Sequence, residues 1–227
     1  MNKPMKVMTF DEVVRNRRSV RGFLPKEVPM ETMREIFELA QLAPSNCNIQ
    51  PWITHVVSGE SLKQLGNKLV EAAKAGREPD PDWPADKKFP GVYRERQIDA
   101  AVRLYGNMGV ARHDVEGRQA AYLRNQMFFD APHAVFIFML GMFDAREAVD
   151  LGIYAQNLML SMTSRGVDSC AQGALGLYAS IVREHLGLEP DLQILFGISF
   201  GYEDPAVAAN RTRTGRATVD EHIIFHR

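Results

Sequence analysis

The run His133-Ala-Val-Phe-Ile-Phe-Met-Leu140 determines how the rest of the chain can be arranged. Every residue after His133 is apolar, so both faces of an extended segment would be apolar. A strand of this kind is buried on both sides of its sheet. The run therefore predicts a central strand.

Helical patterns and shorter strand-like segments surround this run. Capping boxes at Thr9 and at Asp144 predict the starts of two helices. The second helix is apolar nearly all round, which places it at the centre of a domain or against a partner subunit. Further helices are predicted over 29–42, 58–75, 94–105, 115–128 and 178–186, and further strands over 53–58, 167–170 and 192–201. This pattern indicates an α+β or α/β fold with helices on a central sheet.

Length and composition are those of an ordinary globular protein. The 227 residues suffice for one large domain or at most two small ones. A net charge of -1 gives no bulk electrostatic reason to bind nucleic acid or an anionic membrane. No apolar signal segment opens the chain, so a cytoplasmic protein is expected. Cys47 and Cys170 are isolated and predict neither a disulfide framework nor a metal site.

Two segments depart from regular patterning. Residues 76–91 contain Pro79, Pro81, Pro84 and Pro90, which indicates a surface excursion or lid, or else a tolerated insertion. The tail from residue 210 is basic and ends in the strand-like Ile223-Ile-Phe225. Such a tail would add to another sheet edge, so a homodimer with embracing C-terminal segments is expected; a monodisperse monomer in sedimentation would contradict it.

Arginine and hydroxyl groups concentrate in two distant clusters, Arg17-Arg-Ser-Val-Arg21 and Arg211-Thr-Arg-Thr-Gly-Arg216. A guanidinium group donates two parallel hydrogen bonds and remains charged, which suits a phosphate monoester. The two clusters would then converge on one anion. The alternative is a pair of solvated basic patches.

Two further segments have the character of ligand-binding loops. Ala43-Pro-Ser-Asn-Cys-Asn-Ile-Gln-Pro-Trp52 is a rigid connection rich in amide and hydroxyl groups, although it also fits an ordinary loop. Gly173-Ala-Leu-Gly176 follows a predicted strand, and its glycines would let a planar ring approach the backbone. Neither the GxGxxG nor the P-loop signature occurs in the chain.

Together these motifs resemble the nitroreductase family of flavoenzymes over residues 9–225. The resemblance rests on the order of three features: Arg17 to Arg21 after a short first helix, the proline-bounded loop to Trp52, and a terminal Arg after a Gly-Tyr strand end. The tail Asn-Arg-Thr-Arg-Thr-Gly-Arg is most similar to that of nitrobenzoate-reductase-like members. The resemblance implies one α+β domain over 1–227, with a central, mostly antiparallel sheet flanked by helices, a lid-like excursion over about 76–115, a C-terminal arm over about 205–227, and an entwined homodimer.

The family's FMN contacts can be carried over by position. The resemblance assigns the phosphate to Arg17 and Ser19 with Arg18 beside them, and the N1–C2 carbonyl side of the flavin ring to Arg21. Arg216 matches a terminal phosphate-binding Arg, with Arg213 as a helper, but Thr214 stands where the family often has Lys. The loop residues expected to reach the partner's flavin are Pro44, Ser45, Asn46 and Asn48, and the backbone expected near flavin N5 is Gly173, Ala174, Leu175 and Gly176.

The resemblance implies hydride transfer from NADH or NADPH through flavin N5 to a nitroaromatic compound by a ping-pong mechanism. No side-chain acid or base and no metal is expected, because the flavin supplies the chemistry. Arg94 or Arg96 would meet a carboxylated substrate. An iodotyrosine-deiodinase-like dehalogenase is an alternative, although Ala75 stands where that branch has a Tyr after Glu71. A flavin-storage protein without turnover is another.

Overall fold

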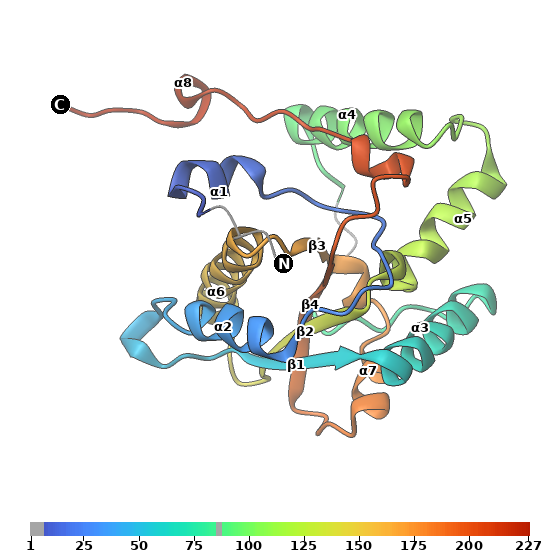
Figure 1. The fold of residues 1–227 in the computed structure, drawn as a ribbon, viewed down its shortest axis with the longest axis horizontal. Helices are drawn as coiled ribbons and strands as arrows, with labels where there is room; N and C mark the ends of the chain where they lie inside the picture. Colours follow the sequence, from blue (N-terminus) through green and yellow to red (C-terminus); the bar gives the residue numbers. More distant parts are fainter. Residues whose placement is uncertain (1–6, 85–87) are drawn as a thin grey trace, which may run out of the picture.

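A computed structural model describes residues 7–84 and 88–227. Its centre is a sheet of four strands, β1 (Ile53–Ser58), β2 (His133–Leu140), β3 (Asp168–Gln172) and β4 (Leu192–Gly201). The strand order is β1-β2-β4-β3 and every neighbouring pair is antiparallel (Figure 1). The prediction of a central strand is confirmed, since β2 lies between β1 and β4. Because every pair is antiparallel, the fold class is α+β and not α/β.

Eight α-helices surround the sheet within the described residues: α1 (Phe10–Asn16), α2 (Met30–Ala40), α3 (Gly59–Lys74), α4 (Gly91–Asn107), α5 (Val115–Gln126), α6 (Ala145–Ser164), α7 (Ala179–Leu186) and α8 (Val219–His222). Short 3-10 turns lie at η1 (Asn46–Asn48), η2 (Phe128–Asp130), η3 (Gly173–Gly176) and η4 (Ala208–Arg211). Both predicted capping boxes are present, at the starts of α1 and α6.

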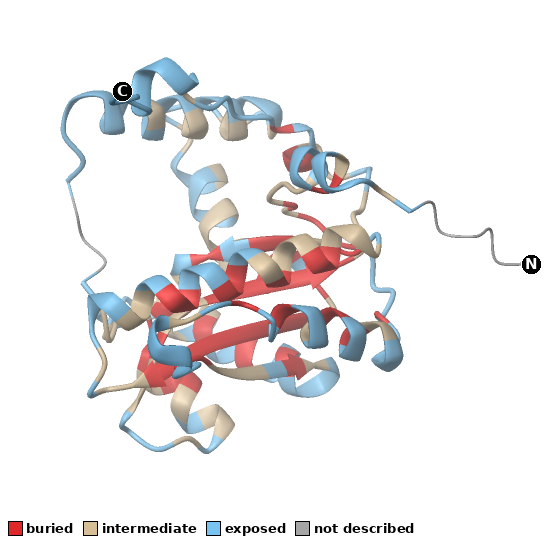
Figure 2. Ribbon diagram, turned by 90° about the vertical axis from the view of Figure 1, so that its left-hand side faces the viewer, coloured by how far each residue is buried: buried red, intermediate tan, exposed pale blue. Residues whose placement is uncertain are grey.

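The alternation of β2 side chains divides the core into two layers. Ala134, Phe136 and Phe138 belong to the cluster that includes side chains of α3 and α7. Val135, Ile137 and Met139 belong to the cluster that includes side chains of α2 and α6. Successive side chains of a strand point to opposite faces, so an unbroken apolar run can supply both layers. The buried residues accordingly concentrate on the sheet and on the helix faces that cover it (Figure 2).

The strand-like C-terminal tail pairs with no sheet edge of its own chain among the described residues, so its expected addition to the sheet of a partner stays a prediction. Residues 223–227 follow α8 and belong to no strand, and Ile224 and Phe225 are 78% and 71% exposed. A strand needs a neighbour for its backbone hydrogen bonds, and in the described chain no other segment pairs with this tail. The exposed outer face of α6, with Val149 61% exposed, is also apolar. Both features leave apolar surface outside the two cores.

The proline-rich excursion is partly fixed to the sheet. Residues 85–87 lie outside the described residues, but Asp80 N donates to Leu177 O at 2.9 Å, and Ile194 N donates to Asp82 Oδ2 at 2.8 Å. The segment then enters α4, which contacts η4 of the C-terminal arm. Among the described helices, none has the length and apolar character needed to cross a membrane.

Candidate cofactor site

A cavity of about 810 Å³ lies between the N-terminal segment, α4, α6 and the C-terminal arm. Its cationic lining is drawn from both arginine clusters of the sequence, so the structure brings these clusters together. The residues that line it are Val14, Arg15, Arg17, Arg18, Ser19, Arg21, Ala100, Ala101, Leu104, Tyr105, Gln156, Thr212, Arg213, Thr214 and Arg216.

The first arginine cluster is extended because it pairs with the sheet edge. Ser19 forms a bridge with Ser169 of β3, and Val20 N donates to Ser169 O at 3.0 Å. Val20 is completely buried in the core. Side chains alternate along extended backbone, so Arg17, Ser19 and Arg21 share the side opposite to Val20. This spacing delivers two guanidinium groups and a hydroxyl group to one face.

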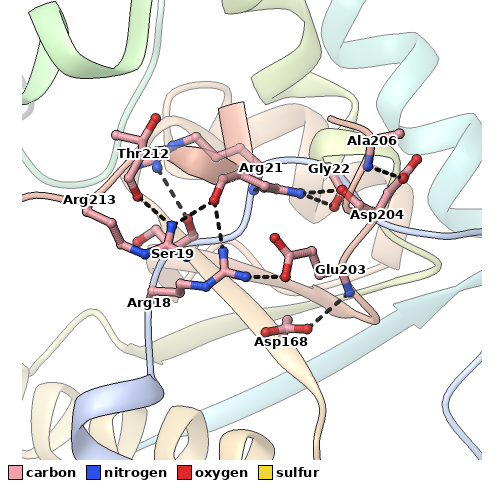
Figure 3. A network of polar contacts seen from close by, with 11 residues as sticks. Arg18, Ser19, Arg21, Gly22, Asp168, Glu203, Asp204, Ala206, Thr212 and Arg213 are labelled. Carbon is pink, nitrogen blue, oxygen red and sulfur yellow. Dashed lines mark hydrogen bonds and ion pairs between the residues drawn. The ribbon is translucent and has the colours of Figure 1, made fainter. Parts of the chain in front are cut away.

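Arg18 lies on the other side of the segment and has a different partner. Its guanidinium forms an ion pair with Glu203, just beyond β4, and donates to Asn210 O at 3.4 Å (Figure 3). Glu203 N in turn donates to Asp168 Oδ2 at 3.0 Å. Burial raises the pKa of Asp168, against the opposing effects of this hydrogen bond and of the Arg18 charge. Arg18 is therefore largely neutralised by protein carboxylate.

Arg17 and Arg216 lie close enough for their charges to interact, and neither forms an ion pair with a described carboxylate. The pKa of Arg17 is lowered by burial and then by the charge of Arg216. Arg216 and Arg213 donate to carbonyl oxygens of their own arm, as in the 2.8 Å contact from Arg216 Nη1 to Gly215 O. Within residues 7–84 and 88–227, no ion pair engages Arg17, Arg21, Arg213 or Arg216. The cavity thus has the electrostatics of an anion site.

The buried thiol of Cys170 lies close to this cationic cluster. Burial raises its pKa, although Arg21, a hydrogen bond with Ser19, and Arg17 all act in the opposite direction. The thiol is accordingly protonated at neutral pH. It contributes to the core and supplies no anion to offset the arginines.

The α4 wall of the cavity is apolar and contains small side chains. Ala100, Ala101 and Leu104 line it together with Tyr105. Asn107 Nδ2 donates to Thr212 Oγ1 at 3.1 Å and fixes the end of α4 to the arm. A ligand held by the arginines would have apolar surface on its other side.

The loop expected to meet a flavin in the partner is not part of this cavity. It packs on α6, where the buried Asp150 accepts from Asn46 N at 3.1 Å, and Gln50 N donates to Ser45 Oγ at 2.9 Å. Cys47 and Asn48 have φ values of 50° and 57°, which are unusual for residues other than glycine. These constraints hold an exposed polar loop in a defined shape, and Pro44 at its start is exposed too.

The Gly173–Gly176 turn directly follows β3. Gln172 anchors its start, because its Nε2 donates to Asn125 Oδ1 at 2.6 Å. A Cβ on Gly173 would meet nothing within 4 Å, whereas Leu175 is buried and Ala174 is half-buried. One edge of the turn is therefore open to a ligand, but none of its residues lines the arginine cavity.

Arg94 and Arg96 lie on α4 outside the cavity lining. Arg94 Nη1 donates to Gln97 Oε1 at 2.5 Å, and Arg96 forms an ion pair of 3.5 Å with Glu221 in the arm. Sequence reasoning missed the α4 wall and Asn210, a buried residue of η4 that contacts both arginine clusters. The only signal for Asn210 was its position at the start of the Asn-Arg-Thr-Arg run.

Comparison with known proteins places this chain in a known family. Residues 14–202 match the model of the nitroreductase family. Nitroreductase NfnB of Mycolicibacterium smegmatis is 44% identical over 96% of this chain and 92% of its own length. A 4-nitrobenzoate reductase of Nocardioides sp. is 35% identical over 96% of this chain and 90% of its own length.

The fold agrees with the sequence match. The crystal structure of the FMN-dependent nitroreductase NfnB from Mycobacterium smegmatis in complex with NADPH superposes with a TM-score of 0.92 and covers 96% of this chain and 97% of that chain. The resemblance stated from the motifs is confirmed, together with the predicted α+β architecture. The chain therefore belongs to the nitroreductase family of enzymes.

Proposed function

We propose that this protein binds FMN in the arginine cavity and reduces nitroaromatic compounds with NADH or NADPH. The observation that supports this most directly is the convergence of Arg17, Ser19, Arg213 and Arg216 on one cavity. A phosphate monoester carries about two negative charges and has three acceptor oxygens. The cavity offers guanidinium groups that have no carboxylate partner among the described residues. Such groups can donate charge-assisted hydrogen bonds to a phosphate monoester.

When bound, FMN supplies hydride transfer at N5, first from NAD(P)H and then to the oxidant in a ping-pong cycle. The side chains of the protein would orient the flavin and supply positive charge to the site. Arg17, Ser19 and Arg216 would hold the phosphate, with Arg213 as a helper, while Arg18 braces the segment through its ion pair with Glu203. Arg21 would meet the N1–C2 carbonyl side, where a fixed cation would stabilise the negative charge of a reduced ring. The Gly173–Gly176 turn, which does not line the cavity, would supply backbone near N5.

We further propose that the working enzyme is a homodimer. The exposed tail at Ile224 and Phe225 and the exposed apolar face of α6 provide surface for a second copy. The constrained loop of Ser45, Asn46 and Asn48, preceded by Pro44, would then contact the flavin of the partner subunit. Asn48→Ala should weaken FMN retention without unfolding the protein, and unchanged affinity would contradict the assignment.

The substrate we propose is a flat nitroaromatic compound, with a carboxylated one as the narrower case. Of the enzymes reported above, the 4-nitrobenzoate reductase of Nocardioides is named for a carboxylated nitroaromatic substrate, and the M. smegmatis enzyme is named a nitroreductase. Arg94 is exposed and Arg96 is half-buried, and both lie on α4, the apolar wall of the cavity. If they recognise a carboxylate, the Arg94→Ala, Arg96→Ala double variant raises the KM for nitrobenzoate and leaves that for nitrobenzene unchanged.

Absorbance spectroscopy of the purified protein tests the main proposal. The flavin band should bleach during anaerobic titration with NADH or NADPH and return on addition of a nitroarene. A flavin that stays oxidised would refute the enzyme reading in favour of flavin storage, and a protein that binds no FMN would refute both. Arg213→Gln should weaken FMN binding, whereas Arg211→Gln is the matched control because Arg211 is exposed and does not line the cavity.

A further inference from the structure

The buried side chain of Asn210 joins the two arginine clusters. It lies in η4 at the base of the C-terminal arm and is 3% exposed. Its Oδ1 accepts from Arg21 N at 2.6 Å, and its Nδ2 donates to Gly22 O at 2.8 Å and to Asp204 O at 2.9 Å. These three contacts use both amide hydrogens and the amide oxygen. A side chain can form all three hydrogen bonds only if it both donates and accepts and has the length of asparagine.

The backbone carbonyl of the same residue contacts guanidinium groups from both clusters. Arg213 Nη1 donates to Asn210 O at 2.8 Å, and Arg18 Nη1 donates to it at 3.4 Å. The side-chain bonds fix the position of η4, so they also fix where this carbonyl lies. Figure 3 shows Arg18, Arg21 and Arg213 gathered around this part of the arm, with Gly22 and Asp204 beside them.

Close backbone approach reinforces the same junction. Asp204 N donates to Gly22 O at 3.0 Å. A Cβ added to Gly22 would lie 2.5 Å from Val207 Cγ1, so the arm packs directly against the backbone of the N-terminal segment. The carbonyl of Gly22 therefore accepts from two groups of the arm. Asn210 is the member of this junction that also contacts Arg21 and Arg213.

We propose that Asn210 is a positioning residue that fixes the backbone at Arg21 and holds the guanidinium of Arg213 in the geometry needed to bind the flavin phosphate. This inference rests on the proposed function, because it takes FMN as the ligand of the cavity. Asn210 itself does not line the cavity. It acts through the backbone of Arg21 and through Arg213, whose flexible side chain would otherwise sample many orientations before meeting an anion.

The test compares FMN with riboflavin, which has the same ring and no phosphate. Dissociation constants of apoprotein for both flavins are measured by fluorescence quenching for the wild type, Asn210→Ala and Asn210→Asp. Asn210→Asp has the same size and keeps the acceptor for Arg21 N, but it places an oxygen against the carbonyls of Gly22 and Asp204. Ile36→Val in the buried face of α2 is the control for a general loss of stability.

Both Asn210 variants should lose about tenfold or more of the preference for FMN over riboflavin, with a smaller change in riboflavin affinity through the backbone of Arg21. Ile36→Val should keep the wild-type preference. If the wild type itself binds FMN and riboflavin equally, the proposed function fails. If the wild type prefers FMN and the Asn210 variants retain that preference, only the present inference is overturned.

If the Asn210 variants fail to fold, a variant of Arg213 still tests the proposal. Arg213 is exposed, so Arg213→Gln removes the oriented guanidinium with little risk to the fold. The proposal then requires a reduced preference for FMN over riboflavin in Arg213→Gln. An unchanged preference would show that the carbonyl of Asn210 does not orient a phosphate-binding group, and would overturn the inference.

Discussion

Replacing Gly22 with Ala should separate the arm from the N-terminal segment by steric contact alone. The added Cβ would lie 2.5, 2.6 and 2.6 Å from three side-chain carbons of Val207. Carbon atoms in favourable contact are about 3.5–4.0 Å apart, so the two segments must separate by about 1 Å. Gly22 does not have a left-handed backbone conformation, so alanine is compatible with its backbone.

The size of the effect follows from overpacking. Inserting a methyl group into a closely packed site costs about 1–3 kcal/mol. In a chain of this size each kcal/mol shifts the thermal midpoint by about 2–4 °C. Gly22→Ala should therefore lower the midpoint of the apoprotein by roughly 2–12 °C. FMN binding should weaken as well, since Gly22 O accepts from Asp204 N and Asn210 Nδ2.

A double-mutant cycle with Val207→Gly isolates the steric cause. Val207→Gly removes all three carbons that the new Cβ would meet, so the double variant should recover most of the stability that Gly22→Ala loses relative to its Val207→Gly background. Differential scanning calorimetry of the four proteins measures this coupling. A Gly22→Ala protein as stable as the wild type would refute the reasoning. Equal losses with and without Val207 would place the cost elsewhere.

Two other predictions concern charge. Arg17→Gln should weaken FMN binding about tenfold or more by loss of a charge-assisted hydrogen bond, whereas Arg34→Gln on the exposed surface of α2 should not; equal affinities in a fluorescence titration would contradict this. The pKa of His133 is lowered by burial, with a smaller opposing effect of Glu27, and its Nε2 accepts from Val28 N at 2.9 Å. In the unfolded chain the His133 ring is protonated as the pH falls through about 6.5, whereas in the folded protein it stays neutral to lower pH. The stability that His133 contributes is therefore complete above about pH 6.5 and is lost as the pH falls toward the lower folded pKa. Thermal midpoints from about pH 8 to about pH 5 should fall less steeply in His133→Asn; an unchanged slope would assign the effect to other groups, such as His55, whose pKa burial also lowers.

The sequence carried enough information for the sheet and for one half of the cavity. The apolar run of β2 serves both cores because its side chains alternate, and that property is visible in the residues themselves. The spacing of Arg17, Ser19 and Arg21 places three groups on one side of an extended segment for the same reason. Local patterns of this kind can be interpreted without knowing which residues pack against them.

The parts that sequence reasoning missed depend on long-range contacts. Asn210 contacts Arg21 across 189 positions of sequence, and no periodicity relates them. The α4 wall has no buried residue, so its amphipathic pattern is weak although Ala100 and Leu104 line the cavity. Ile223–Phe225 has the composition of a strand but lacks a neighbouring strand in the described chain. In each case the local sequence is compatible with several outcomes, and tertiary contact selects one.

Because the cavity is assembled from distant segments of the chain, cofactor binding and folding are coupled equilibria. Arg17 and Arg216 come from opposite ends of the chain, and the pKa of Arg17 is lowered first by burial and then by the charge of Arg216. Only the folded protein brings these like charges together. An anion bound between them reverses the sign of that interaction. It would stabilise the docked arm in proportion to the logarithm of its concentration above the dissociation constant. The flavin phosphate proposed here would therefore act as the counterion that the fold does not supply from its own described carboxylates, and the arm would dock most firmly in the protein that carries its cofactor.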